Sequence, residues 1–183
     1  MLMFNLFKKM LRFPVSTYYS FRYLRKCKAG ANVNIFSPYY VEHSEFLQFD
    51  DYCHVGPGAF IAAKGGVFIG NNVILAPNVS IWSYSHDYNS LISVPYGGAD
   101  KLGEVRIDAN VWIGYGAIIL PGTSLGEGCV VGAGAVVKGM FDAGSIIVGN
   151  PGVVIGRRDE DVYRRLVNDN KLYLPMKFGK KGV

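Results

Sequence analysis

The chain has few cysteines and no long apolar run that is free of charge. Its three cysteines, Cys27, Cys53 and Cys129, form no CxxC pair and cannot all join each other, which is typical of free thiols in a reducing cytoplasm. No stretch of 18 residues is both apolar and uncharged, so an ordinary transmembrane helix is excluded. The apolar N-terminus is interrupted by basic residues and lacks a small-residue cleavage site, unlike a signal peptide. We therefore expect a cytoplasmic protein.

Acidic residues are absent from residues 1–28, and the charge along the chain is uneven. The net charge is +7 for residues 1–28, −6 for residues 29–156 and +4 for residues 157–183. A nucleic-acid-binding protein is expected to carry basic residues on its folded body, whereas this body is mildly acidic. We therefore expect no nucleic-acid partner. We expect the three segments to be an N-terminal cap, a central domain and a C-terminal helix with a basic tail.

A six-residue repeat organises the central segment. Half of the 183 residues are apolar, enough for one domain with a sizeable core, and 23 are glycines without a collagen-like triplet. Across eleven six-residue units between positions 55 and 137, the first residue is always Ile, Leu or Val, and the fifth is small or β-branched in nine. The clearest units are VGPGAF at 55, IGNNVI at 69, LAPNVS at 75, IGYGAI at 113, LGEGCV at 125 and VGAGAV at 131.

This period predicts an all-β solenoid. In a short strand the side chains alternate, so the aliphatic first residue and the small fifth residue both point inward. Gly, Asn and Asp between them allow the backbone to turn a corner with a positive φ. Three such units close one triangular coil, and coils stack about 4.8 Å apart. We expect about five coils, opening at positions 29, 49, 69, 107 and 125.

The repeat is interrupted three times, at residues 47–48, 67–68 and 87–106. Each interruption follows three complete units, so we expect all three to lie at the same corner of successive coils. Two are dipeptides and the third is a loop of 20 residues. Long loops on economical scaffolds usually carry function. His86 is the last residue before this loop, which makes it the leading candidate for a catalytic group.

Four features of the chain carry a resemblance to one known family. These are the repeats, the SYSHDY segment before the loop, the restart VRIDANVWIGYGAIILPGTSLGEGCVVGAGAVV and the closing GNPGVVIGRR. In these features the chain resembles the hexapeptide-repeat acetyltransferases. The run from APNVS to GNPG is most similar to the galactoside and maltose acetyltransferases, and SHDY is also found in O-acetyltransferases of surface polysaccharides. The resemblance covers about residues 29–158 and implies a left-handed parallel β-helix. It also implies a homotrimer with sites between subunits, and transfer of an acetyl group from acetyl-CoA to a sugar hydroxyl.

Direct transfer needs a base for the acceptor hydroxyl and a binding surface for the acyl carrier. His86 suits the first task because a neutral imidazole can accept a proton. Asp87, Glu104 or a backbone carbonyl is a candidate to orient its ring, and these alternatives stay open. The fifth-position cysteines Cys53 and Cys129 should point inward, so a covalent acyl-enzyme is disfavoured.

Further binding residues are expected, some from the resemblance and others from their chemistry and position. Asn78 and Trp112 match positions near the acceptor, where Asn78 could equally be a corner residue and Trp112 a packing residue at the trimer contact. Asp87 is grouped with them as an acceptor contact. The expected cofactor contacts are Gly114, Tyr115, Gly132, Ala133, Lys138 and Pro151, with Arg157 and Arg158 for the phosphates. A solvated basic tail is the alternative for the two arginines.

Other functions on the same scaffold remain as alternatives. The nearest are an N-acetyltransferase of a nucleotide-linked amino sugar and a non-catalytic trimeric scaffold. The N-acetyltransferases commonly have an extra domain before the repeat, and 28 residues are too few to form it. A zinc hydratase of the γ-carbonic anhydrase type needs three histidines per zinc, including a His-x4-His pair that is absent here, so we expect no metal.

The two ends allow different interpretations. Residues 1–26 combine aromatic and basic side chains, which suits either a helical cap over the first coil or contact with a membrane surface. Residues 159–169 should form a short helix with acidic residues at its start. The remaining tail is either disordered or reaches a neighbouring subunit.

Overall fold

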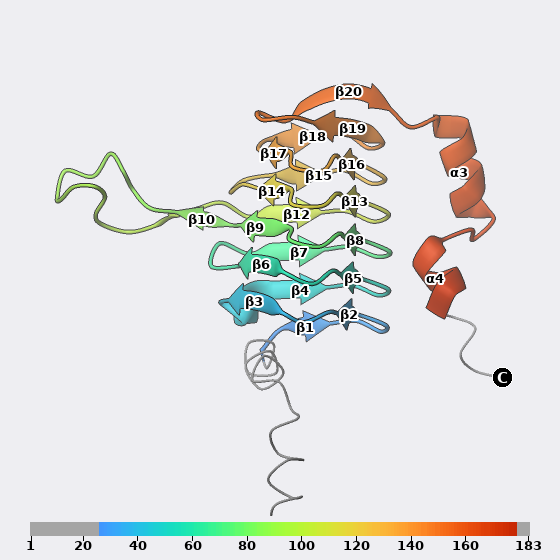
Figure 1. Cartoon of the computed structure of the whole chain (residues 1–183), viewed down its shortest axis with the longest axis horizontal. Helices are drawn as coiled ribbons and strands as arrows, with labels where there is room; N and C mark the ends of the chain where they lie inside the picture. The colour runs from blue at the N-terminus through green and yellow to red at the C-terminus, as the bar shows by residue number, and fades with distance from the viewer. Residues whose placement is uncertain (1–25, 179–183) are drawn as a thin grey trace, which may run out of the picture.

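The protein, in a computed structural model that describes residues 26–178, is a parallel β-solenoid (Figure 1). Its coils have three faces, each a sheet that runs along the stack. The first face contains β1 (Lys28–Ala29), β4 (Leu47–Phe49), β7 (Val67–Ile69), β12 (Val105–Ile107), β15 (Ser124–Leu125) and β18 (Met140–Phe141). The second contains β2 (Asn34–Ile35), β5 (His54–Val55), β8 (Ile74–Leu75), β13 (Trp112–Ile113), β16 (Val130–Val131), β19 (Ser145–Val148) and the antiparallel β20 (Val153–Arg157). The third contains β3 (Tyr39–Glu42), β6 (Ala59–Ala62), β9 (Ser80–Trp82), β14 (Ile118–Ile119) and β17 (Val136–Val137).

The strand register follows the repeat predicted from the sequence. The opening residues of the coils pair in one continuous ladder on the first face: Ala29, Phe49, Ile69, Ile107, Leu125 and Phe141. The inward aliphatic residues of the other faces, such as Ile113 and Ile119, are fully buried. Burying one such side chain contributes about 1.5–3 kcal/mol, so the stack is held mainly by this apolar column. The predicted solenoid is confirmed.

The described residues make about six turns, one more than the five expected. The additional turn opens at Phe141, which would be the fifth residue of a regular six-residue unit beginning at Val137. Phe141 pairs with Leu125, only 16 positions earlier, because the last complete coil is two residues shorter than the regular 18. A fixed period cannot predict such a deletion.

All three interruptions lie at one corner, between the third and the first face, which we call the arm corner. Between aligned positions of the third and first faces, the chain runs eight residues at 41–49 and at 61–69 but six at 119–125. The extra residues therefore lie in or beside the connections 43–46, 63–66 and 83–104. The short 3-10 helix η1 (Ser44–Phe46) lies in the first of them. The expected corner is therefore right, although the dipeptides were misplaced: Leu47 and Val67 are buried strand residues, and the last two loop residues, 105–106, belong to β12.

The third connection forms an arm that projects sideways from the stack (Figure 1). At its base, β10 (Tyr84–Ser85) and β11 (Lys101–Leu102) pair antiparallel, with Ser85 opposite Lys101. We define the arm as residues 84–102. Its outer part exposes apolar side chains, among them Leu91 and Val94.

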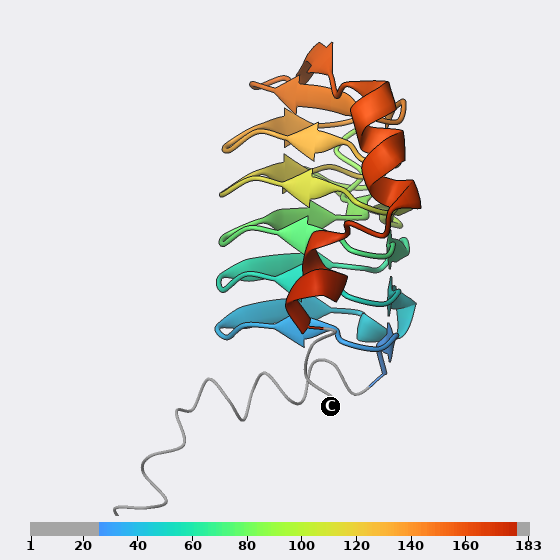
Figure 2. The same ribbon diagram turned by 90° about the vertical axis from the view of Figure 1, so that its right-hand side faces the viewer.

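Two helices run along the outside of the coils, at the corner between the first and second faces (Figures 1 and 2). α3 (Glu160–Asn168) is capped by the Asp159 carboxylate, which accepts from the Val162 amide at 2.9 Å. This helix is the one predicted over residues 159–169. α4 (Tyr173–Phe178) was not predicted, and its Leu174 is buried against the chain's own coils. None of the helices formed by residues 26–178 is long and apolar enough to cross a membrane.

Side-chain hydrogen bonds join these helices to the coils. The Tyr163 hydroxyl donates to Glu127 at 2.8 Å and accepts from Asn110 at 2.9 Å. Lower down the stack, the Leu174 amide donates to Asn72 Oδ1 at 3.0 Å. We call this edge the strap corner, because the C-terminal segment ties several coils together along it. The proposed N-terminal cap falls largely on residues 1–25, which lie outside the described part.

The cysteine thiols are shielded from solvent, as the fifth position in the six-residue unit predicted for Cys53 and Cys129. Cys53 and Cys129 are buried in the core, and burial raises the pKa of Cys53 to about 12 and that of Cys27 to about 11. Because the thiolate is the reactive form, we expect native protein to react with Ellman's reagent far more slowly than a free thiol at pH 8. In denaturant, all three cysteines should react. Rapid reaction of Cys53 in the native state would contradict this packing.

Candidate active site

His86 lies at the base of the arm, directly after strand β10. Its Nδ1 lies 2.8 Å from Asp100 Oδ1, on the returning side of the arm. An ionised carboxylate can only accept a hydrogen bond, so Nδ1 carries a proton, and in the neutral form of the ring Nε2 presents its lone pair. The ring is 52% exposed. The arrangement therefore leaves a proton-accepting nitrogen open to a bound molecule.

The aromatic residues of the arm enclose the imidazole. Tyr96 stacks on the His86 ring, with centroids 4.1 Å apart and planes inclined by 9°. Tyr84 meets the same ring edge-on at 6.4 Å. The Tyr84 hydroxyl donates to Glu42 Oε2 at 2.8 Å, and this hydrogen bond, with burial, raises the pKa of Tyr84 to about 12. The ring of His86 is thus fixed from three directions, by Asp100, Tyr96 and Tyr84.

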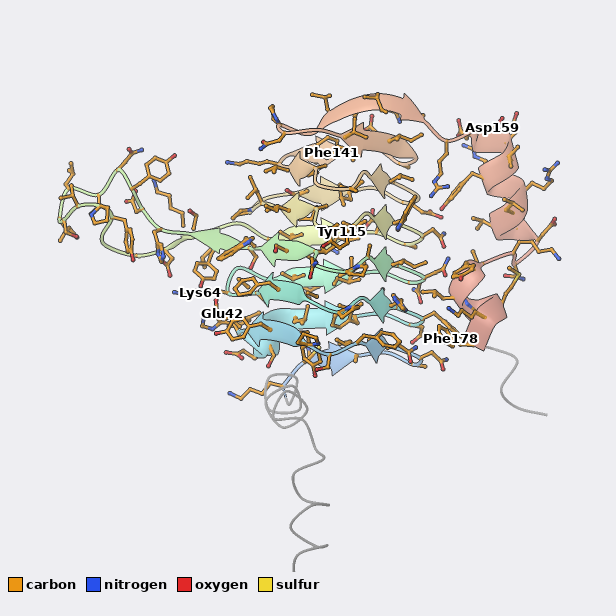
Figure 3. The ribbon with its side chains drawn as sticks, viewed as in Figure 1. Glu42, Lys64, Tyr115, Phe141, Asp159 and Phe178 are labelled. Carbon is orange, nitrogen blue, oxygen red and sulfur yellow. The ribbon has the colours of Figure 1, made fainter. Side chains whose placement is uncertain are left out.

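Asp100 is held in turn by Lys64, from the connection between β6 and β7. Lys64 Nζ donates to Asp100 Oδ2 at 2.5 Å, so the two carboxylate oxygens serve different partners. The hydrogen bond from Lys64, and then that from His86, hold the pKa of Asp100 below its usual range. Lys64 and Glu42 lie on the side of the solenoid from which the arm projects (Figure 3). The two acids that the sequence offered as orienting groups have other partners.

Asp87 pairs with Lys101 Nζ at 2.7 Å across the base of the arm, which lowers the pKa of Asp87 and raises that of Lys101. Glu104 pairs with Arg106 at 2.8 Å. The orienting group is therefore Asp100, which sequence reasoning missed. The available signal was weak: Asp100 follows His86 by 14 positions in a segment without periodicity, and only the β10–β11 pairing brings the two together.

A second group of predicted site residues gathers at the corner between the second and third faces, which we call the strip corner. Gly114, Tyr115, Gly132 and Ala133 lie there in successive coils. Asn78 lies one coil earlier with a φ of 61°, and its Nδ2 donates to the Tyr115 hydroxyl at 2.7 Å. Asn78 is thus a corner residue that also fixes Tyr115. It does not lie at the corner of His86 within the same chain.

The remaining predicted residues are spread over other parts of the coil. Trp112 points outward from the second face and is half-exposed, as expected. Lys138 lies at the arm corner of a later coil, and Pro151 lies in the turn between β19 and β20. Arg157 pairs with Asp142 at 2.8 Å, and Arg158 donates to the Gly128 carbonyl at 2.6 Å, both at the strap corner. The structure therefore does not bring all the expected cofactor contacts together in one chain.

A column of aromatic rings on the outer side of the third face was also missed. Tyr40 stacks on Phe60 at 5.1 Å, and Phe60 stacks on Trp82 at 4.7 Å. These spacings match the distance between coils, so the rings stack mainly on each other along the solenoid. The column reaches the base of the arm through Glu42, which accepts from the Tyr40 and Tyr84 hydroxyls. It supports the base of the arm from below.

Comparison with known proteins agrees with this architecture. Residues 104–139 match the family described as bacterial transferase hexapeptide (six repeats). A putative acetyltransferase of Schizosaccharomyces pombe is 41% identical over 85 residues, which make up 46% of this chain. The aligned stretch covers only 40% of that relative's length.

Two solved structures share the fold. A maltose O-acetyltransferase from Clostridium difficile 630 has a TM-score of 0.66 and 30% sequence identity, covering 76% of this chain and 73% of the other. A galactoside acetyltransferase in complex with coenzyme A has a TM-score of 0.63 and 24% identity, covering 74% of this chain and 67% of that one. The latter likeness establishes the fold alone. With its hexapeptide coils and interrupted arm corner, the chain belongs to the hexapeptide-repeat acetyltransferase superfamily.

Proposed function

We propose that this protein is an acetyl-CoA-dependent O-acetyltransferase that modifies a sugar hydroxyl, of the kind found in precursors of surface glycans. The observation that carries the proposal is the hydrogen-bonded pair of His86 and Asp100 at the base of the arm. It orients the imidazole so that Nε2 is directed away from the carboxylate, and it leaves the ring half-exposed to a bound molecule. The Schizosaccharomyces pombe relative is named a putative acetyltransferase, and the Clostridium difficile structure is named a maltose O-acetyltransferase.

In the proposed reaction, His86 Nε2 takes the proton from the acceptor hydroxyl as its oxygen attacks the thioester carbonyl. The C–O bond forms, the C–S bond breaks, and the proton then passes from Nε2 to the departing sulfur. Asp100 keeps Nδ1 protonated throughout and offsets the positive charge of the transient imidazolium. General base action of this kind is worth about 10²- to 10⁴-fold in rate. Acetyl-CoA supplies the activated acyl group.

The strip corner is suited to an extended thioester chain. Gly116 and Gly134 lie there in successive coils, and a Cβ at either position would meet no atom within 4 Å. The corner is therefore sterically open at these two glycines, although their amides already donate to the Pro77 and Tyr115 carbonyls of the neighbouring coil. A pantetheine arm laid parallel to the stack would pair with the backbone groups at this corner that such coil-to-coil hydrogen bonds leave free. Gly114, Gly132 and Ala133 belong to the same strip. We keep Tyr115, Lys138 and Pro151 as proposed contacts, with Arg157 and Arg158 as candidates for the phosphates.

The separation of the two groups of residues favours a site shared between subunits. His86 lies at the arm corner, and Asn78 and the glycine strip lie at the strip corner of the same prism. In a homotrimer, the arm corner of one subunit would face the strip of the next. Trp112 and Asp87 would then flank the acceptor. Contact of residues 1–26 with a membrane surface remains part of the proposal, outside the described residues.

The direct test is release of coenzyme A thiol from acetyl-CoA in the presence of an acceptor panel. The panel includes free mono- and oligosaccharides, nucleotide-linked sugars and matched amino sugars, so that O- and N-transfer are separated. We expect acceptor-dependent thiol release with hydroxyl acceptors, and mass spectrometry should show a gain of one acetyl group. Preference for the amino sugar would favour N-acetylation instead. Failure to bind acetyl-CoA at all would favour a non-catalytic scaffold.

A further inference from the structure

We propose that Lys64 sets the basicity of His86 by sharing the Asp100 carboxylate. The inference rests on the proposed function, in which His86 is the base, and it adds a positioning and tuning residue from a different coil. Lys64 does not contact the His86 ring. It acts through Asp100, whose Oδ1 contacts His86 and whose Oδ2 accepts from Lys64.

The geometry makes this carboxylate a junction between two parts of the fold. Asp100 comes from the returning side of the arm, and Lys64 comes from the arm corner one coil earlier, 36 positions away in the chain. Lys64 also lies over the Tyr84 ring, with Nζ 5.5 Å from its centroid, so its ammonium group is held on two sides. The ion pair therefore anchors the returning side of the arm to the solenoid and fixes where Asp100 meets the imidazole.

The charge on Asp100 is divided between a permanent cation and a titratable ring. An unpaired carboxylate 2.8 Å from Nδ1 would stabilise the imidazolium form and so reduce the fraction of free base at neutral pH. Because Lys64 forms an ion pair with Oδ2, the pair of Lys64 and Asp100 is neutral overall. The carboxylate still orients the ring through its hydrogen bond with Nδ1. The arrangement thus separates two effects of an acidic partner: it keeps the orientation and limits the rise in basicity.

The other groups around the ring do not replace this balance. Tyr96 stacks on the imidazole. Tyr84 lies at its edge, and its hydrogen bond to Glu42, with burial, raises the pKa of Tyr84 to about 12, so this side chain is uncharged at neutral pH. Asp87 and Lys101 on the arm offset each other. Glu42 on β3 is engaged by two tyrosine hydroxyls: those of Tyr40 and Tyr84. His43, which meets the far side of Tyr84 at 6.3 Å, and the Glu104–Arg106 pair complete the charged surroundings.

The test is an NMR titration of the imidazole in ¹⁵N-histidine-labelled protein, with the His86 signal assigned by its loss in His86→Ala. Lys64→Met should raise the midpoint of the His86 titration, because Asp100 then faces the ring uncompensated. Asp100→Asn should lower it, because the carboxylate is gone. We expect each shift to be about half a unit to one unit, since the groups are partly solvated. Lys64→Arg should restore the parent value.

Lys101→Met is the matched control, because it removes one lysine from the surroundings of His86, on the arm itself, while leaving Asp100 paired with Lys64. It should move the His86 titration less than Lys64→Met does. If the role of Lys64 is purely structural, Lys64→Met and Asp100→Asn should shift the midpoint of the His86 titration in the same direction or not at all. Equal shifts of the midpoint in Lys64→Met and Lys101→Met would mean that the loss of any nearby positive charge has the same effect. Either result overturns the inference.

Kinetics separate this inference from the proposed function. The acid limb of the pH profile of kcat/KM should move up in Lys64→Met, so that activity lost near neutral pH returns at higher pH. Full turnover by His86→Ala would remove the proposed function, whereas the NMR titration would still report on Lys64. Unshifted titrations together with an inactive His86→Ala would remove only the role of Lys64.

Discussion

Replacing His86 with alanine should lower kcat for acetyl transfer by about 10²- to 10⁴-fold, the usual contribution of a general base. The loss should fall on kcat, because His86 is proposed to meet the acceptor hydroxyl as it reacts, whereas the strip corner is proposed to hold acetyl-CoA. The dissociation constant for acetyl-CoA, measured by calorimetry, should therefore stay within a few-fold of the parent value. The His86→Gln variant should lose a similar factor, because an amide cannot accept and return the proton.

The histidine His54 provides a matched control. It lies on the second face, where it packs against Phe36 at 4.9 Å, away from the arm corner. His54→Gln should retain parent turnover in the same assay. Retention of full turnover by His86→Ala, with correct folding shown by circular dichroism, would remove the base from the mechanism.

The fold was largely predictable because the solenoid repeats one local rule. The aliphatic residues of each unit must fall on the inner side, so their period gives the register directly, from Ala29 through Leu125. The corner of the insertions followed from the same phase. The α4 helix was not predictable in this way, because Leu174 is buried only through contact with coils far away in sequence.

The site was predictable only in part, for a related reason. His86 was singled out in the sequence because it borders the break in the period. Its partner Asp100 lies inside the arm, where neither a six-residue period nor a helical one applies. Lys64 gave no signal in the sequence, because its ion pair with Asp100 joins segments that are 36 positions apart. Arg157 and Arg158 follow the end of the repeat, and no register indicated that they would lie at the strap corner.

Gly114 was expected from the sequence to contact the cofactor, but close packing of the coils is enough to require a glycine there. A Cβ there would lie 2.7 Å from the Ala133 amide nitrogen of the next coil, and the backbone of a packed stack cannot withdraw from it. Gly114→Ala should therefore lower the free energy of unfolding by about 3 kcal/mol, at the upper end for overpacking. The measurement is denaturant unfolding followed by circular dichroism.

Gly116→Ala separates this clash from the cost of the backbone conformation alone. Gly116 lies in the same corner with a φ of 65°, and nothing lies within 4 Å of its Cβ position. Only the left-handed conformation is penalised there, at about 1–2 kcal/mol. We expect Gly116→Ala to lose less free energy of unfolding than Gly114→Ala and to bind acetyl-CoA more weakly than the parent. That result would separate two roles of the strip: close stacking of coils at Gly114 and open space for the cofactor at Gly116. Equal losses of stability would mean that coil stacking does not select glycine at position 114.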